Sequence, residues 1–224
     1  MTSSARLHPA GALGLSLTAS LVALIVAGWA FGAVLEDVAA RNELASWDPL
    51  VARFVVTHRE SWLTPVMSVV TELGSVTTLM TLILIVGVAW WRWRGSWRAL
   101  GLLAASAAGA TALANGIKVL VGQQRPPAAT DIARHVTGYA FPSGHVTAAA
   151  AVFGMLAALL ASATPIWRRK VAAWATALAL AVLVAASRLY LGAHWLTDVL
   201  GGLALGAAWV FVVLILTRAL DRLR

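Results

Sequence analysis

The segment Val199–Thr217, VLGGLALGAAWVFVVLILT, decides the fold class of this chain. It holds no charged residue, and a helix needs about 20 mostly apolar residues to cross the hydrocarbon core of a bilayer. Because every backbone amide in lipid must find its partner within the protein, the segment is expected to be a helix. Gly202 and Gly206 lie four residues apart in it, a spacing that lets a neighbouring helix approach closely.

Five further segments of the same kind precede it. The predicted spans cover residues 10–35, 70–91, 99–118, 146–167, 171–188 and 198–217. Of the 224 residues, 60% are hydrophobic and 12% are charged, roughly half the charged fraction of a soluble domain. We therefore predict an all-α, integral-membrane bundle of six transmembrane helices in a single domain over residues 1–224. The first segment could instead be a cleaved signal peptide, but its apolar run is long for one.

The basic residues predict the orientation of this bundle, because Lys and Arg accumulate in cytoplasmic loops. The clusters that flank spans are Arg6, Arg92, Arg94, Arg98, Arg168, Arg169, Lys170, Arg218, Arg222 and Arg224. With six spans they share one side, so both termini are expected in the cytoplasm. The net charge of +8 is dispersed among these loops, which favours membrane topology over a nucleic-acid partner. The Ala-rich spans indicate a bacterial cytoplasmic membrane.

The longest connection runs from Glu36 to Glu72 and mixes charged residues with apolar pairs. A short interfacial helix is expected there. The chain contains no cysteine, so it offers no disulfide framework and no thiolate metal site.

Three polar motifs lie beside the apolar segments, at residues 118–126, 142–145 and 187–198. The first follows span three, the second precedes span four, and the third joins spans five and six. Alternation of the spans therefore places all three at the outer face, whereas an error of one span would separate them across the bilayer. This convergence predicts one polar site at the outer end of the bundle.

Each motif also has a plain structural interpretation. The basic residues suit interfacial anchors, Ser143 suits a helix cap, and His194 with Asp198 suits a solvated ion pair. The joint pattern favours phosphoryl transfer instead. Since residues four apart share one helix face, Asp198 can accept one ring N–H of His194 and leave the other nitrogen free to attack. Nearby cations would balance the charge of the phosphoryl group.

The pattern K-x6-R-P, P-S-G-H and S-R-x5-H-x3-D resembles that of the type 2 phosphatidic acid phosphatase family. The matching residues are Lys118, Arg125, Pro126, Pro142, Ser143, Gly144, His145, Ser187, Arg188, His194 and Asp198. These motifs cover residues 118–198, and the six-span layout extends the resemblance over nearly the whole chain. Residues Thr71–Ser75 also look like a recurrent segment of that family.

The resemblance implies a role for each matching side chain. His194 would attack phosphorus and form a phosphohistidine, Asp198 would orient His194, and His145 would protonate the leaving group and then activate water. The phosphate would be held by Lys118, Arg125, Ser143, Gly144 and Arg188. The family also implies a reaction without a metal or another cofactor.

The implied substrate is a phosphorylated lipid of the surrounding bilayer: phosphatidic acid, phosphatidylglycerol phosphate or a polyprenyl pyrophosphate such as undecaprenyl pyrophosphate. Hydrolysis is the expected reaction. The alternatives are a phosphotransferase that passes phosphate to a lipid or sugar acceptor, a non-catalytic lipid-binding or transport protein, and a channel or transporter. The sequence leaves the choice of lipid, the oligomeric state and any regulation open.

Overall fold

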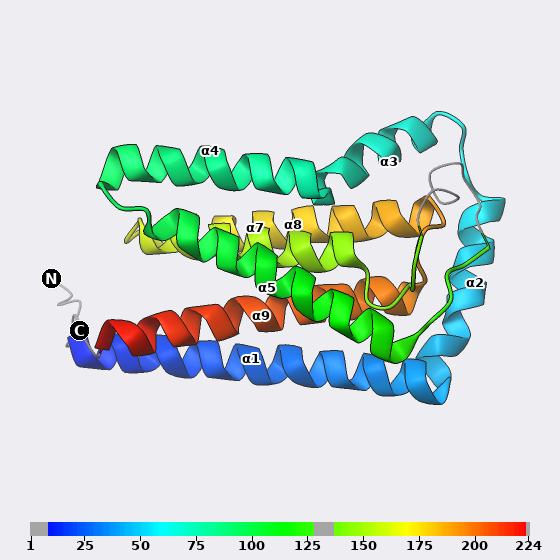
Figure 1. Cartoon of the computed structure of the whole chain (residues 1–224), viewed down its shortest axis with the longest axis horizontal. Coiled ribbons are helices and arrows are strands. Elements are labelled where there is room, and N and C mark those ends of the chain that lie inside the picture. Colours follow the sequence, from blue (N-terminus) through cyan, green and yellow to red (C-terminus); the bar gives the residue numbers. More distant parts are fainter. Residues whose placement is uncertain (1–8, 128–136, 223–224) are drawn as a thin grey trace, which may run out of the picture.

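The computed structural model describes residues 9–127 and 137–222, so Arg6 and Arg224 lie outside the described residues. All regular elements within these ranges are helices (Figure 1). They are α1 (Pro9–Ala40), α2 (Glu43–Thr57), α3 (Leu63–Thr71), the 3₁₀ turn η1 (Glu72–Gly74), α4 (Val76–Arg94), α5 (Arg98–Val121), α7 (Gly144–Ser162), α8 (Trp167–Tyr190) and α9 (Leu196–Arg222).

Six of these helices are long and apolar enough to cross a membrane, which confirms the predicted fold class. They are α1, α4, α5, α7, α8 and α9. Figure 1 shows them running side by side, with the start of α1 and the end of α9 at one end of the bundle and α2 and α3 at the other. The long connection after α1 therefore forms two helices, where a single short one was expected.

The second span begins later than its predicted start at residue 70. Thr71 ends α3, the chain turns through η1, and Ser75 adopts an extended conformation. Its hydroxyl accepts the N–H of Thr78 at 3.3 Å and so caps α4. Such a cap marks a helix start because it satisfies a backbone donor that lacks an intrahelical partner. The apolar pattern continues across this break, so hydropathy alone did not predict it.

The fourth span also ends before its predicted limit at residue 167. Helix α7 stops at Ser162, and Trp167 already begins α8. Pro165 lies between them and cannot continue a helix ladder because it lacks an N–H. The remaining spans extend beyond the predicted limits by roughly one turn at one or both ends, since charged residues at helix ends reach the polar boundary.

Helix α7 forms the centre of the bundle and packs against α5, α8 and α9. The small residues of α9 make this packing close. A Cβ atom on Gly206 would lie 2.6 Å from the carbonyl oxygen of Thr147, and one on Gly202 would lie 3.0 Å from that of Ser143. The α9 backbone thus contacts the first turns of α7, which brings the second and third motifs together.

Candidate active site

Lys118 and the chain just before α7 form one wall of the site. Helix α5 ends at Val121. The next residue, Gly122, has a φ of 66°, which suits a residue without a side chain, and its N–H donates to the carbonyl of Lys118. The ammonium group of Lys118 donates to the carbonyls of Tyr139 at 2.9 Å and Ala140 at 3.1 Å. A cation at the end of α5 is also favoured by the partial negative charge of that helix terminus.

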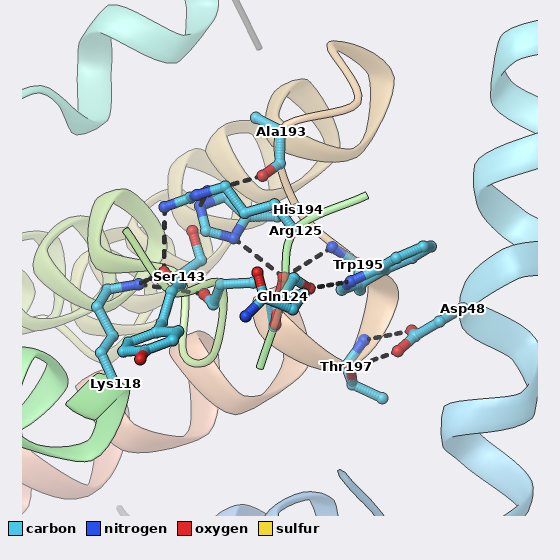
Figure 2. A network of polar contacts seen from close by, with 12 residues as sticks. Asp48, Lys118, Gln124, Arg125, Ser143, Ala193, His194, Trp195 and Thr197 are labelled. Carbon is cyan, nitrogen blue, oxygen red and sulfur yellow. Dashed lines mark hydrogen bonds and ion pairs between the residues drawn. The ribbon is translucent and has the colours of Figure 1, made fainter. Parts of the chain in front are cut away.

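Arg125 connects this wall to the turn between α8 and α9. Its Nε donates to the carbonyl of Gly138 at 2.9 Å, and its Nη2 to that of Tyr139 at 3.2 Å. Its Nη1 donates to the carbonyl of Ala193 at 2.8 Å and lies 3.1 Å from Nε2 of His194. The guanidinium is therefore fixed beside the ring nitrogen of His194 that faces the site (Figure 2).

Ser143 occupies the N-cap position of α7, as expected, but its hydroxyl makes no capping hydrogen bond. The side chain is fully buried, and Oγ has no hydrogen-bond partner among the described residues. The Ser143 N–H donates instead to the backbone carbonyl of Asp198 at 2.9 Å. Gly144 and His145 form the first turn of α7, where unpaired backbone N–H groups favour an anion.

Arg188, near the end of α8, is a buried residue and not an interfacial anchor. It is 2% exposed, and its Nη1 donates to the hydroxyl of Thr71 at 3.1 Å. Within the described residues, its Nε and Nη2 atoms have no hydrogen-bond partner. A buried cation with two unused donors is costly unless an anion completes its partners, so this geometry fits a phosphate-binding group.

His194 and Asp198 form a buried pair. Their side chains are 2% and 0% exposed, and Nδ1 of His194 lies 3.1 Å from Oδ2 of Asp198. The solvated ion pair considered from the sequence is therefore wrong. The prediction that the two residues share one helix face is also wrong, because α9 begins at Leu196 and His194 lies in the turn before it. Asp198 reaches back over the helix start, and its Oδ2 also accepts the N–H of Trp195 at 2.8 Å.

Burial and the neighbouring charges keep His194 neutral. Burial lowers the pKa of this imidazole well below its ordinary value, and the neighbouring cations Arg125, Arg188 and Lys118 lower it further, as does His145. Because the Asp198 carboxylate accepts hydrogen bonds, the ring proton belongs on Nδ1. Nε2 then carries a lone pair and accepts the Nη1–H of Arg125 in this structure. A phosphoryl group that replaced this contact would have its negatively charged oxygens beside the cations of the site.

The structure adds residues that the sequence did not identify. Thr71 lay within the segment that resembled the family, but its contact with Arg188 could not be predicted. Asp48 of α2 accepts two hydrogen bonds from Thr197, and no sequence signal connects residues so far apart. The indole N–H of Trp195 donates to the carbonyl of Gln124 at 2.8 Å, beside Arg125.

Comparisons with known proteins agree with this geometry. Residues 99–222 match the PAP2 superfamily. Phosphatidylglycerophosphatase B of Bacillus subtilis (strain 168) is 36% identical over 174 residues, which cover 77% of this chain and 84% of that protein. The crystal structure of a transmembrane PAP2-type phosphatidylglycerolphosphate phosphatase from Bacillus subtilis has a TM-score of 0.79 and 33% identity, and covers 88% of this chain and 98% of its own. The chain therefore belongs to the PAP2 superfamily and is an enzyme of its lipid-phosphatase type.

Proposed function

We propose that this protein hydrolyses the phosphate monoester of a membrane lipid through a phosphohistidine on His194, with phosphatidylglycerol phosphate as the first candidate substrate. The observation that carries the proposal is the state of His194. Its Nδ1 is 3.1 Å from Asp198, and its Nε2 is 3.1 Å from the Arg125 guanidinium. The names of the Bacillus subtilis relative and of the similar solved structure from that organism favour phosphatidylglycerol phosphate over the other lipids.

In the first step, the Nε2 lone pair attacks phosphorus, and the bond between phosphorus and the lipid oxygen breaks. His145, at the start of α7, donates a proton to the departing alkoxide, which leaves as the lipid alcohol. The Nδ1–H of His194 remains bonded to Asp198, which stabilises the positive charge that develops on the ring. In the second step, His145 takes a proton from water as the water oxygen attacks phosphorus, and inorganic phosphate leaves His194.

Cations compensate the charge of the phosphoryl oxygens in this mechanism. A cation about 4 Å from a charged oxygen contributes about 4 kcal/mol at an effective dielectric constant of about 20. Among the described residues, the Nε and Nη2 atoms of Arg188 and the Ser143 hydroxyl are buried without a hydrogen-bond partner, and a bound phosphate would supply one. Gly144 is the first residue of α7, where an N–H has no acceptor within the helix. Lys118 and Arg125 donate to backbone carbonyls, so a phosphate would exchange some of these bonds for charge-assisted ones, which are stronger.

The proposed orientation puts the site at the outer face of the membrane and both termini in the cytoplasm. The clusters at Arg92–Arg98 and Arg168–Lys170 lie in the connections at one end of the bundle, and the three motifs lie at the other. The positive-inside rule then assigns the first end to the cytoplasm. A bacterial cytoplasmic membrane is the proposed location, with the lipid phosphate presented from the outer leaflet.

Phosphate release by the purified protein in detergent tests this function. The substrates are phosphatidylglycerol phosphate, phosphatidic acid and undecaprenyl pyrophosphate, each with excess chelator and each beside His194→Ala. We expect chelator-resistant release, fastest with phosphatidylglycerol phosphate, and none above background in the folded variant. Activity of His194→Ala equal to that of the wild type would exclude His194 as the nucleophile. Loss of phosphate from the lipid only when an alcohol or sugar acceptor is added, with the phosphate recovered on that acceptor, would identify a phosphotransferase.

A further inference from the structure

Helix α2 presents one buried side chain, and that side chain is a carboxylate. Asp48 is 5% exposed, whereas its neighbours Trp47, Leu50 and Phe54 are 57%, 58% and 62% exposed. Burial raises the pKa of Asp48, and its hydrogen bonds to Thr197 act in the opposite direction. A carboxylate is buried at a cost unless hydrogen bonds compensate for lost water, so its partners identify what the position does.

Both partners of Asp48 belong to the first turn of α9. Oδ1 accepts the N–H of Thr197 at 2.9 Å, and Oδ2 accepts its hydroxyl at 2.7 Å, as Figure 2 shows. Thr197 is fully buried and directly precedes Asp198. The carboxylate thus fixes the backbone of the residue next to the one that orients His194.

The start of α9 needs this external acceptor because its own cap is incomplete. In a capping box, the N-cap side chain accepts an N–H of the first turn while the third helical residue reaches back to the N-cap N–H. Asp198 makes the second contact by accepting the N–H of Trp195. Trp195 cannot make the first, since its indole N–H is a donor and bonds to Gln124. Asp48 supplies the missing acceptor from another helix.

We infer that Asp48 is a positioning residue for the reaction: through Thr197 it holds the first turn of α9 so that Asp198 keeps His194 aligned for attack. The inference rests on the proposed function. Among the described residues, the side-chain hydrogen bonds of Asp48 go to Thr197 and not to a proposed phosphate-binding cation. We therefore expect its removal to change the alignment of His194 and to leave phosphate binding intact.

Five variants test the inference in the full-length protein, with wild type and His194→Ala alongside. Asp48→Ala removes both hydrogen bonds, and Asp48→Asn removes the charge at constant shape. Thr197→Val removes the hydroxyl, and Thr197→Ser keeps it. Glu43→Gln neutralises an exposed carboxylate on the same helix as a matched control. The measurements are kcat and KM for phosphatidylglycerol phosphate, the inhibition constant of inorganic phosphate, and the thermal midpoint in detergent.

We expect Asp48→Ala to lower kcat about 10-fold or more, because small misplacements of a reacting group are amplified in the rate. Thr197→Val should lower kcat less, and Thr197→Ser and Glu43→Gln should keep the wild-type rate. KM and the phosphate inhibition constant should stay near the wild-type values throughout.

The inference is overturned if Asp48→Ala has the wild-type kcat, or if its activity falls only in proportion to the amount of folded protein. It is also overturned if KM and the phosphate inhibition constant rise while kcat is unchanged. If Asp48→Ala does not fold, Asp48→Asn and Thr197→Val decide by the same criteria. A wild-type protein that releases no phosphate overturns the proposed function itself, whereas an active wild type with an equally active Asp48→Ala overturns the positioning role alone.

Discussion

The Oδ2 atom of Asp198 accepts two hydrogen bonds, one from His194 and one from the N–H of Trp195. The same residue also receives the Ser143 N–H on its backbone carbonyl. Asp198 therefore connects His194, the proposed nucleophile, with the start of α9 and the start of α7. Substitutions at this position combine a chemical effect with a structural one, so kinetics alone cannot separate its roles.

The lowered pKa of His194 makes a prediction for the pH dependence. A histidine whose pKa is depressed stays neutral, and hence nucleophilic, at pH values below its ordinary pKa of about 6.5. We expect the acidic limb of the kcat/KM profile, which reports the free enzyme, to lie below that value. The measurement is the initial rate of phosphate release between pH 4 and 9 in buffers of constant ionic strength, a range of about five units around that reference. An NMR titration of the free protein in which the His194 ring has a pKa at or above the ordinary histidine value would contradict a neutral resting His194.

Residue spacing predicted which side chains meet, but not how they meet. The interval from His194 to Asp198 indicated a contact, and the two side chains are in contact. The interval suggested neighbours on a helix, whereas the pair spans a turn and a helix start. Asp48 and Thr71 gave no signal of their own, because their partners lie on helices that only the packed bundle brings close. Sequence spacing predicts contacts between residues that are close in the sequence, whereas contacts such as those of Asp48 and Thr71 depend on the tertiary structure.

At the scale of helices, the crossing of α7 and α9 depends on glycine. A Cβ atom on Gly206 would lie 2.6 Å from the carbonyl oxygen of Thr147 and 2.7 Å from Cβ of Ala150. Neither atom can move without its backbone, so the two helices must separate. The start of α7, with Ser143 at its N-cap, would move with them.

Gly206→Ala should therefore destabilise the protein by about 1–3 kcal/mol, as overpacking does in well-packed cores. Gly101→Ala is the matched control, since nothing lies within 4 Å of a Cβ at that position. Alanine favours a helix over glycine by up to about 1 kcal/mol at either site, so the comparison removes that contribution. The measurement is unfolding in mixed micelles with increasing denaturing detergent. Equal midpoints for the two variants would show that the crossing tolerates a methyl group.

Helix limits were less predictable than helix existence. Length and apolarity identified all six spans, because the bilayer imposes a minimum length on each. The break at Ser75 and the early end at Ser162 depend on single caps and turns, which hydropathy averages over. The position of Thr71 beside Arg188 follows from that break, since a continuous helix from residue 70 would have no turn at η1.

For the whole molecule, the absence of cysteine from the sequence makes the orientation directly testable. Ser61→Cys places a thiol between α2 and α3, and Pro165→Cys places one between α7 and α8, both at exposed positions. We expect a membrane-impermeant maleimide to label the first in intact bacterial cells and the second only after permeabilisation. The reverse pattern would put the site in the cytoplasm and would contradict the outer-leaflet substrate.

The packing of α1 has a consequence for the order of synthesis. This helix packs chiefly against α9, the last helix of the chain, and only 6% of its apolar span is buried. During translation α1 leaves the ribosome first, and its main partner emerges last. It must persist in the bilayer as an isolated helix until then, which lipid-facing apolar side chains permit. Since α9 also carries Asp198, which the proposed mechanism requires, we expect a nascent chain to stay inactive until this helix is inserted, so that hydrolysis begins only after all six spans are in the bilayer.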